Sequence, residues 1–484
     1  MSAAFDFSAS ASALPDLYVD LDGSLIATDL LDESMLRLVR DSPMSLLSLP
    51  AWLLQGKAVL KDQVASRVEV DVSTLPYRPE VLSYVREARA QGRRVVLATA
   101  SDQRLADRVA KHLGVFDAVL ASDGKRNLGG SKKLEAIRED AAGRDFAYLG
   151  DRHVDLQVWD GAQAAVVVSR SDALARQAAK KTALEAHIRP PATAPRRYLY
   201  AMRLHQWLKN LLVFVPLMPV LHALTLPVLV NACIAFFAFG LMASGIYILN
   251  DLLDLESDRK HKRKRFRPFA AGEISARTGL LMCAGLCLAS LTISLVFMPP
   301  IFLAVLLVYL ALTTGYSFFL KRRAIVDVFS LAALYTIRLA AGAAATGLPL
   351  SLWILSFSLF IFVSLALAKR YVELSGTPTE VKQMSRDRNY HPTDVQLVLA
   401  GGVAAGQMAT VVLSLYLQDP QIVARYAHPM YLWAMVPLIL FWIMRIWLKA
   451  VRGALHDDPV VFAARDWVSR LAVAISAVVL WAAG

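Results

Sequence analysis

The sequence has few cysteines, and it lacks a secretory signal and any evident internal repeat. Cys233, Cys283 and Cys287 all lie within apolar stretches, and an odd number in such places argues against a disulfide framework or a zinc site. The first residues contain neither a basic region nor a continuous apolar region of the kind that directs secretion. We therefore expect the N-terminal part of the chain to remain in the cytoplasm.

The chain carries a net charge of +12, but its basic residues do not suggest a nucleic-acid surface. Much of the excess sits in short segments between long apolar runs, most densely at residues 259–265. That distribution is typical of the cytoplasmic loops of a membrane protein. We therefore expect a membrane-embedded protein with no nucleic-acid partner.

The composition changes abruptly along the chain, which predicts two domains. The mean hydropathy of +0.44 averages a mixed, polar first part and a second part dominated by apolar runs. Three prolines separate the two parts and indicate a semi-rigid linker. The predicted limits are 1–186 for a soluble domain, 187–199 for the linker and 200–484 for a membrane domain.

The soluble part alternates short apolar runs with helical patterns, which is typical of a parallel, doubly wound α/β sheet. Residues 30–75 are expected to form a mostly helical insertion. Polar residues follow three of the predicted strands, where such sheets place their sites. The strands are expected at 17–19, 95–98, 146–149 and 165–168, with helices at 78–91 and 102–113.

The second part contains nine apolar segments near the length that a bilayer requires, so an all-α polytopic domain is expected. Basic residues are concentrated in every second turn between these segments. This alternation predicts a protein of the inner membrane whose N-terminal domain and basic loops lie on the cytoplasmic side. The expected spans are 208–224, 228–249, 278–298, 300–320, 325–345, 351–370, 395–416, 430–450 and 467–483.

The segment 250–258 carries the most informative polar pattern in the membrane part. Asp251, Asp254 and Asp258 follow Asn250 at spacings that share one face of a helix. Carboxylates at a membrane edge are costly unless a positive group balances them. Mg²⁺ on a diphosphate is one such partner; the alternative is a solvated acidic helix end paired with the basic run that follows.

This motif at the end of the second span resembles the UbiA superfamily of intramembrane prenyltransferases, over about 200–484. Within it, the segments 203–210, 264–272, 316–321, 324–328 and 368–374 look most like decaprenyl-phosphate phosphoribosyltransferases. The resemblance implies nine transmembrane helices and a site that opens to the cytoplasm. Aromatic prenyltransferases of the superfamily carry a second aspartate-rich motif after the sixth span. Here Lys369, Arg370 and Glu373 stand in its place, which makes an aromatic acceptor less expected.

The resemblance implies that the three aspartates are catalytic and hold Mg²⁺ on the leaving pyrophosphate of phosphoribosyl pyrophosphate. Arg338 lies within an apolar span and is a functional candidate, with snorkelling to an interface as its alternative. The expected substrate-binding residues of this domain are Lys209, Asn250, Arg265, Arg267, Tyr316, Lys321, Arg322, Asp327, Arg338, Lys369 and Arg370.

Four short motifs in the soluble part, at 20–24, 98–101, 129–133 and 150–155, together resemble the haloacid dehalogenase superfamily of phosphohydrolases over about 15–185. The resemblance implies a Rossmann-like core with a cap at 30–75. Asp20 would be the nucleophile and Asp22 the general acid and base. Thr99 and Lys133, or Lys132 in place of Lys133, would bind the phosphoryl group. The implied Mg²⁺ ligands are the carboxylates of Asp20, Asp151 and Asp155 and the backbone carbonyl of Asp22, and a catalytically inactive scaffold is the alternative.

Together the two parts predict a two-step enzyme. The substrates would be polyprenyl phosphate and phosphoribosyl pyrophosphate, with Mg²⁺ as cofactor. The soluble domain would then remove the 5-phosphate from the lipid-linked product, for use in a cell-envelope glycan. An aromatic prenyltransferase and a non-catalytic or transport protein are the alternatives, and a homo-oligomer remains open.

Overall fold

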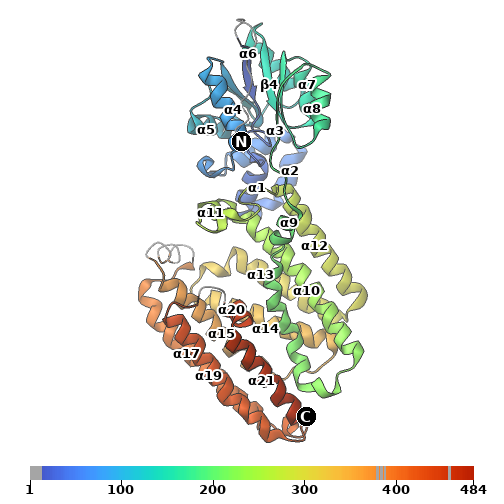
Figure 1. Ribbon diagram of the computed structural model, residues 1–484, viewed down its shortest axis with the longest axis vertical. Helices are drawn as coiled ribbons and strands as arrows, with labels where there is room; N and C mark the ends of the chain where they lie inside the picture. Colours follow the sequence, from blue (N-terminus) through green and yellow to red (C-terminus); the bar gives the residue numbers. More distant parts are fainter. Residues whose placement is uncertain (1–13, 378–380, 382–384, 386–387, 456–458) are drawn as a thin grey trace. The chain divides into compact units, whose positions relative to one another are not determined.

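The computed structural model describes residues 14–377, 381, 385, 388–455 and 459–484 (Figure 1). The chain divides into two compact units. The first contains the described residues of Met1–Ala201 together with Ile248–Met282, and the second contains Met202–Tyr247 together with Cys283–Gly484. The segment that carries Asp251, Asp254 and Asp258 thus belongs to the same unit as the N-terminal α/β fold.

The first unit is built on a six-stranded, all-parallel sheet in the order β3-β2-β1-β4-β5-β6. The expected α/β architecture is confirmed, but two strands were not predicted. Both of these, β3 and β6, lie at the edges of the sheet, where their residues are only partly buried and the apolar pattern is weak. The strands are β1 Asp16–Val19, β2 Val95–Asp102, β3 Ala118–Ser122, β4 Phe146–Gly150, β5 Ala164–Val168 and β6 Ala183–Ile188.

Helices cover both faces of this sheet (Figure 1). Helices α4 (Pro79–Ala90) and α5 (Gln103–Leu113) pack their apolar residues on one face, with Leu17 and Val19 of β1. Helices α6 (Ser131–Ala141), α7 (Leu156–Trp159) and α8 (Asp172–Ala179) pack on the other. Because side chains alternate along a strand, each central strand contributes to both cores.

The insertion between β1 and α4 is helical, as expected. It contains α1 (Leu30–Asp41), α2 (Leu49–Leu54) and α3 (Lys57–Ala65), with two short 3₁₀ helices at Pro43–Leu47 and Val72–Thr74. The side chain of Asp29 accepts a hydrogen bond from Leu31 N and caps α1. The first unit is completed by α9 (Pro195–Ala201), the end of α10 (Leu226–Leu253), α11 (Leu255–Lys260), a 3₁₀ turn at Lys264–Phe266 and the start of α12 (Ala276–Phe297).

Seven helical segments among the described residues are long and apolar enough to cross a membrane: Leu226–Leu253, Ala276–Phe297, Pro300–Arg322, Val326–Thr346, Leu352–Leu374, Pro392–Tyr416 and Pro429–Val451. Two of the nine expected spans differ. The first is a 3₁₀ segment, Leu204–Ala223, which contains Pro216 and Pro219 and is interrupted by a non-helical residue at Val220; proline lacks the amide donor that a regular helix needs. The last, Trp467–Ala483, is a shorter apolar helix.

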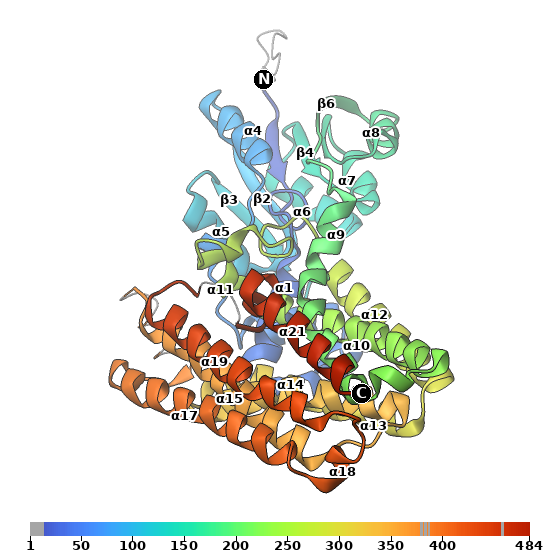
Figure 2. The same ribbon diagram turned by 60° about the horizontal axis from the view of Figure 1, so that its bottom comes forward.

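The second unit contains the 3₁₀ segment Leu204–Ala223, parts of α10 and α12, and the α-helices α13 (Pro300–Phe318), α14 (Val326–Thr346), α15 (Leu352–Leu374), α17 (Val395–Tyr416), α18 (Pro420–Val423), α19 (Met435–Val451), α20 (Pro459–Arg465) and α21 (Trp467–Ala483). Helices α15, α17 and α19 lie side by side (Figure 2). Gly402 of α17 allows this approach, because a Cβ there would overlap the ring of Trp447. Trp447 Nε1 donates to Ser364 Oγ, which donates to the Gly402 carbonyl. Small residues and hydroxyls of this kind join helices in membranes.

Candidate active sites

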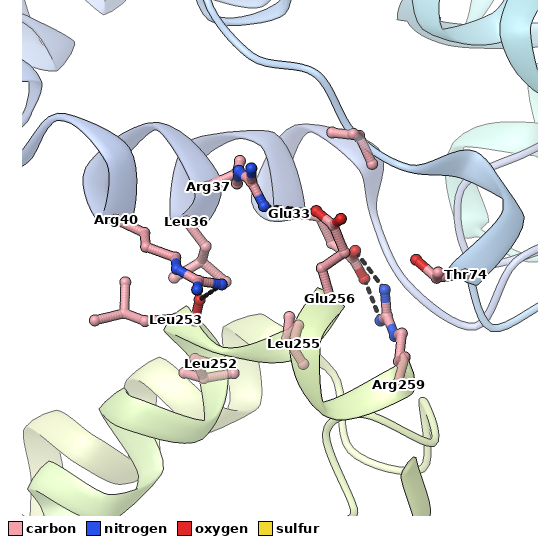
Figure 3. A pocket seen from close by; sticks show the side chains of 11 residues that line it. Glu33, Leu36, Arg37, Arg40, Thr74, Leu252, Leu253, Leu255, Glu256 and Arg259 are labelled. Carbon is pink, nitrogen blue, oxygen red and sulfur yellow. Dashed lines mark hydrogen bonds and ion pairs between the residues drawn. The ribbon is translucent and has the colours of Figure 1, made fainter. Parts of the chain in front are cut away.

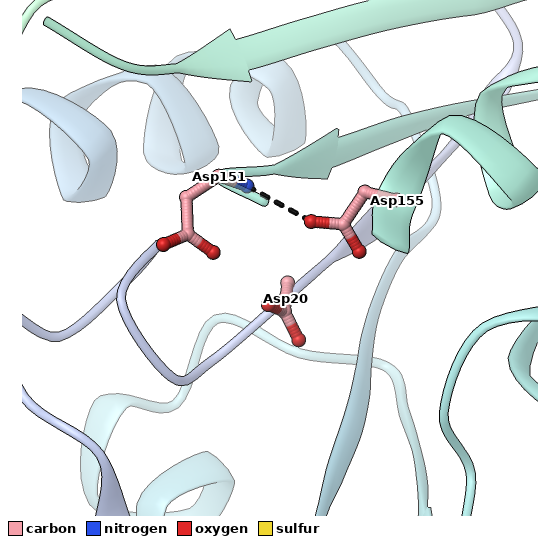
Figure 4. Close-up of side chains that lie close together, drawn as sticks. All are labelled: Asp20, Asp151 and Asp155. Atoms are coloured by element: carbon pink, nitrogen blue, oxygen red, sulfur yellow. Dashed lines mark hydrogen bonds between the residues drawn. The ribbon is translucent and has the colours of Figure 1, made fainter. Parts of the chain in front are cut away.

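A cluster of carboxylates lies at the carboxyl ends of β1 and β4, which are neighbours in the sheet. Oxygens of Asp20, Asp151 and Asp155 all lie within 4.8 Å of one another (Figure 4). Asp20 follows β1, Asp151 follows β4, and Asp155 is buried in the turn after β4. The backbone amides of Asp151 and Arg152 donate to Asp155 Oδ2 at 3.1 and 2.9 Å, which fixes that carboxylate in place.

The electrostatics of this cluster fit a divalent cation. Burial and the neighbouring charges of Asp20 and Asp155 raise the pKa of Asp151 to about 8. Burial raises the pKa of Asp155 as well. Three crowded carboxylates repel one another, and a hard divalent cation that prefers oxygen ligands would relieve this repulsion. The residues present therefore suit the metal that the sequence motifs predicted for Asp20, Asp151 and Asp155.

Gly23 is required where the loop after β1 passes the cluster. Its φ of +83° lies in the left-handed region, and a Cβ at this position would collide with the carboxylate of Asp151. Only glycine adopts this conformation without cost and leaves the space for the carboxylate. Ser24, the next residue, donates to Asp151 Oδ1 at 3.2 Å.

Lys133, and not Lys132, reaches Asp20. Lys133 is buried in the first turn of α6, and its Nζ donates to Asp20 Oδ1 at 2.7 Å and to Tyr148 Oη at 2.8 Å. Lys132 is exposed. Tyr148 in turn donates to Asp155 Oδ1 at 3.0 Å, so this tyrosine, which the motifs did not single out, joins the lysine to the cluster.

Asp22 stands apart from the three-carboxylate cluster and faces hydroxyl groups. Ser101 Oγ donates to its Oδ2 at 2.5 Å, and Thr99 Oγ1 lies 3.5 Å from the same oxygen. The other oxygen accepts from the amide of Leu30 at 2.8 Å. Burial, with the negative charges of Asp29 and Asp20, raises the pKa of Asp22 to about 7. A carboxyl group with such a pKa suits a general acid and base near neutral pH.

Lys61 of the insertion also borders this site and was missed in the sequence. Its Nζ donates to the Ala100 carbonyl at 2.5 Å and to Asn127 Oδ1 at 2.7 Å. Ala100 lies between Thr99 and Ser101 in β2. No local motif marks Lys61, because it is one charged residue among several on a short helix.

The aspartates of segment 250–258 do not lie on one continuous helix, so the expectation of a shared helical face is wrong. Helix α10 ends at Leu253, Asp254 adopts a non-helical conformation, and α11 begins at Leu255. Asp254 N still donates to the Asn250 carbonyl at 3.0 Å. Beside this break, Asp254 Oδ1 lies 3.7 Å from Arg40.

Asp251 and Asp258 instead converge on Arg267. Arg267 Nη1 donates to Asp251 Oδ1 at 3.1 Å and to Asp258 Oδ2 at 2.6 Å, and both aspartates are buried. Two buried carboxylates around one positive nitrogen is a charge arrangement that a divalent cation also fits. Arg265, by contrast, is exposed, and its guanidinium lies over the ring of Phe266.

In the second unit, a buried network forms around Asp327, at the start of α14. Asp327 and Arg370 of α15 have fully buried side chains, and Arg370 Nε donates to Asp327 Oδ2 at 2.6 Å. Tyr390 donates to Asp327 Oδ1 at 2.7 Å. Arg388, which the motifs did not identify as a ligand residue, donates to Tyr316 Oη at 3.0 Å and lies 3.6 Å from Asp327. We call these residues, Tyr316, Asp327, Arg370, Arg388 and Tyr390, the Asp327 cluster.

Arg370 also pairs with Glu373, one turn further along α15. Lys369 and Lys321 are partly buried and Arg322 is exposed. The Asp327 cluster therefore joins three of the predicted binding residues, Tyr316, Asp327 and Arg370.

Arg338 is buried inside the second unit and does not extend to an interface. Its Nε donates to Asn210 Oδ1 at 3.0 Å, and its guanidinium lies over the rings of Phe239, Tyr309 and Tyr335. Lys209 Nζ also lies 5.4 Å from the centre of the Tyr335 ring. Aromatic faces stabilise cations that are removed from water, so the enclosure accounts for a charged residue within an apolar span.

Comparison with known proteins assigns both parts of the chain. The model of the UbiA prenyltransferase family matches residues 211–482, and that of haloacid dehalogenase-like hydrolases matches residues 18–159.

An uncharacterised protein, y4nM, of Sinorhizobium fredii is 39% identical over 459 residues, 94% of this chain and 88% of its own, so the alignment includes both parts. The decaprenyl-phosphate phosphoribosyltransferase of Corynebacterium glutamicum is 32% identical over 255 residues, 52% of this chain and 76% of its own. The solved structure of a UbiA homolog from Archaeoglobus fulgidus bound to GPP and Mg²⁺ matches with 17% identity and a TM-score of 0.45, over 59% of this chain and 99% of its own.

Proposed function

The chain belongs to the UbiA prenyltransferase family and carries a haloacid dehalogenase-like domain, and we propose that it transfers a 5-phosphoribosyl group from phosphoribosyl pyrophosphate to a polyprenyl phosphate. We further propose that the haloacid dehalogenase-like domain then removes the 5-phosphate from the lipid-linked product. In this proposal the haloacid dehalogenase-like domain comprises residues 1–186, the linker residues 187–199 and the transferase domain residues 200–484. The product would supply a pentose for a cell-envelope glycan.

The observation that carries the proposal is the Asp327 cluster. The buried Arg370 pairs with Asp327 and Glu373 at the position where aromatic prenyltransferases of the family have a second aspartate motif. Because Arg370 already neutralises these two carboxylates, they are not available to hold a second metal-bound diphosphate, which counts against an aromatic prenyltransferase and supports the phosphoribosyl donor. The similarity to the C. glutamicum phosphoribosyltransferase supports the same substrate class.

In the transfer step, an oxygen of the lipid phosphate attacks C1 of the ribose. The bond between C1 and the pyrophosphate oxygen breaks, and pyrophosphate leaves. Asp251, Asp254 and Asp258 would hold Mg²⁺, which would neutralise charge on the leaving group. Arg267 positions Asp251 and Asp258, while Lys209, Arg265, Lys321, Arg322 and Lys369 are proposed to attract the phosphates of donor and lipid.

In the phosphatase step, Asp20 attacks the phosphorus of the 5-phosphate and forms an acyl phosphate. Asp22 gives a proton to the departing ribose oxygen and then takes one from the water that hydrolyses the acyl phosphate. Lys133 holds Asp20 in place and neutralises the phosphoryl oxygens. Phosphate is released, and Asp20 returns to its first state.

We also propose that the protein lies in an inner membrane with both sites on the cytoplasmic side. The support is the alternation of basic and non-basic turns along the apolar segments. Cysteine-accessibility labelling at the turn 298–300 and at the basic segment 261–265, in intact cells and in inverted vesicles, tests this orientation. Labelling of residues 261–265 from the outside of intact cells contradicts it.

A donor comparison tests the transferase proposal. Purified protein in nanodiscs receives Mg²⁺ with either labelled phosphoribosyl pyrophosphate and polyprenyl phosphate, or labelled prenyl diphosphate and an aromatic acceptor. We expect the ribose label to enter the lipid phase in the first mixture, with Asp254→Asn at background. Product in the second mixture alone refutes the phosphoribosyl donor and assigns an aromatic acceptor.

A further inference from the structure

Helix α1 of the insertion presents one charged face to the aspartate segment of the same unit. Glu33, Arg37 and Arg40 recur at spacings of four and three residues, so they share one side of the helix. Each meets a partner between residues 253 and 259 (Figure 3). Arg37 pairs with Glu256 at 2.6 Å, and Arg40 Nη1 donates to the Leu253 carbonyl while Nη2 lies 3.7 Å from Asp254.

The pair of Glu33 and Arg259 is the centre of this contact. Both nitrogens of the Arg259 fork donate to the two oxygens of Glu33, at 2.7 and 2.6 Å, and each side chain is only 7% exposed. Arg259 Nε also donates to the Ala270 carbonyl at 3.0 Å. A bidentate pair with fixed geometry resists rotation of α11 about its axis. The apolar side chains of Leu36, Leu252 and Leu255 line the same contact.

The insertion also holds the residues that follow α11. Asp71 pairs with Lys260 at 2.9 Å, and Arg277, in the first turn of α12, donates to Asp29 at 2.9 Å and pairs with Asp32 at 2.7 Å. Gly272 passes so close to Pro76 and Ala27 that a Cβ would lie 2.9 and 3.0 Å from their side chains. The segment from Asp254 to Arg277 is thus attached to the insertion at both ends.

The same helix begins on the phosphatase-like site. The amide of Leu30, the first residue of α1, donates to Asp22. Asp29, which caps the helix, accepts a hydrogen bond from Arg152 at 3.4 Å, and Arg152 follows the proposed metal ligand Asp151. One helix therefore connects a carboxylate of the phosphatase-like site to the segment that carries Asp254 and Asp258.

We infer that α1 is a positioning element for the transferase, with Glu33 as its principal positioning residue. By holding Arg259 it fixes α11, and with α11 the positions of Asp254 and Asp258, the carboxylates that the proposed transferase would use to hold its divalent cation. The inference rests on the proposed transferase function. It assigns the haloacid dehalogenase-like domain a second role that does not depend on its hydrolytic chemistry.

The test compares Glu33→Ala, the charge exchange Glu33→Arg with Arg259→Glu, and a control. The control is Glu185→Ala, which breaks an ion pair of 2.5 Å with the fully buried side chain of Arg93. Both residues belong to the same unit as Glu33, but they are far in sequence from the aspartate segment. All variants are made in the full chain in nanodiscs. Mn²⁺ affinity is measured by electron paramagnetic resonance on an Asp155→Asn background, which removes a ligand of the phosphatase-like site. The Mg²⁺ concentration for half-maximal transfer is measured alongside.

We expect Glu33→Ala to weaken Mn²⁺ binding by about 10–100-fold, the effect typical of residues that hold metal ligands in place. The required Mg²⁺ concentration should rise by a similar factor, and the charge exchange should restore most of the affinity. Glu185→Ala should leave both values unchanged, although it lowers the melting temperature. Mn²⁺ affinity within about twofold of wild type in Glu33→Ala, or an equal loss in Glu185→Ala, overturns the inference.

Mn²⁺ binding does not depend on the identity of the sugar donor. If wild-type protein binds Mn²⁺ but does not use phosphoribosyl pyrophosphate, the proposed function fails while the positioning role of Glu33 is still decided by the binding data. If transfer proceeds and Glu33→Ala binds Mn²⁺ as wild type does, the positioning role alone fails.

Discussion

Replacement of Lys133 by methionine should abolish most phosphatase activity and leave the fold in place. Methionine has nearly the length of lysine, so the side chain still fills the space beside Tyr148. What it removes is the positive charge 2.7 Å from Asp20 and the hydrogen bond to Tyr148. The charge of Asp20 then faces Asp151 and Asp155 without its nearest cation.

The expected magnitude follows from the burial of the pair. The Lys133 and Asp20 side chains are 6% and 9% exposed, so water does not replace the lost partner. Removing one member of a buried ion pair costs about 3–5 kcal/mol of folding stability. Removing a positive group from the transferring phosphoryl oxygens should lower kcat by about 10²–10³-fold, as the loss of one preorganised donor does in other enzymes.

Lys132→Met is the matched control, because Lys132 is adjacent in sequence and exposed. The assay follows release of ³²P from lipid-linked ribose 5-phosphate by the full chain in nanodiscs, at a temperature well below the melting temperature of each variant. Lys132→Met should keep at least about a third of wild-type activity, since surface substitutions change little. Equal losses in the two variants, or a Lys133→Met variant with more than about a tenth of wild-type activity, would refute the assigned role.

Three further outcomes are expected. Gly23→Ala should reduce phosphate release by at least about tenfold, because alanine in the left-handed region costs ~1–2 kcal/mol and its Cβ displaces the Asp151 carboxylate; phosphate release at the wild-type rate contradicts this. Asp327→Asn should lower the melting temperature of the protein in detergent, since it removes one of the two carboxylates that neutralise the buried Arg370 and leaves Glu373 as the other, at a cost of up to about 3–5 kcal/mol, and a shift of less than about 2 °C argues against the pair as observed. Removal of divalent cations with EDTA should stop both transfer and phosphate release, Mg²⁺ should restore both, and either reaction that continues in EDTA does not use a metal.

Much of the fold was predictable, because its signals are local in sequence. Each central strand of the sheet is a short apolar run that ends in a polar residue, so the positions of Asp20 and Asp151 at the ends of β1 and β4 followed from the pattern. The edge strands β3 and β6 were missed, because a strand with one open edge is less buried. The first expected span was apolar enough, but the chain there is a 3₁₀ helix interrupted at Val220, close to its two prolines.

The sites were only partly predictable, because their geometry depends on residues far apart in the chain. Spacing placed Asp251, Asp254 and Asp258 on one helical face, whereas the contact of Arg40 with Leu253 and Asp254 accompanies a break between α10 and α11. The choice between Lys132 and Lys133 depends on which face of α6 meets β1, which two adjacent lysines do not reveal. The pairing of Glu33 with Arg259 spans 226 positions, and no local pattern announces it.

The central claim, coupled transfer and dephosphorylation, is tested most directly with phosphoribosyl pyrophosphate that carries ¹⁴C in the ribose and ³²P in the 5-phosphate. Wild-type protein, polyprenyl phosphate and Mg²⁺ are incubated together, and both labels are counted in the lipid phase over time. The account predicts that ¹⁴C accumulates in the lipid while ³²P is lost as phosphate, and that Asp20→Asn retains both labels in equal amounts. Absence of ¹⁴C from the lipid phase contradicts the transferase assignment, and full retention of ³²P by the wild type contradicts the phosphatase step.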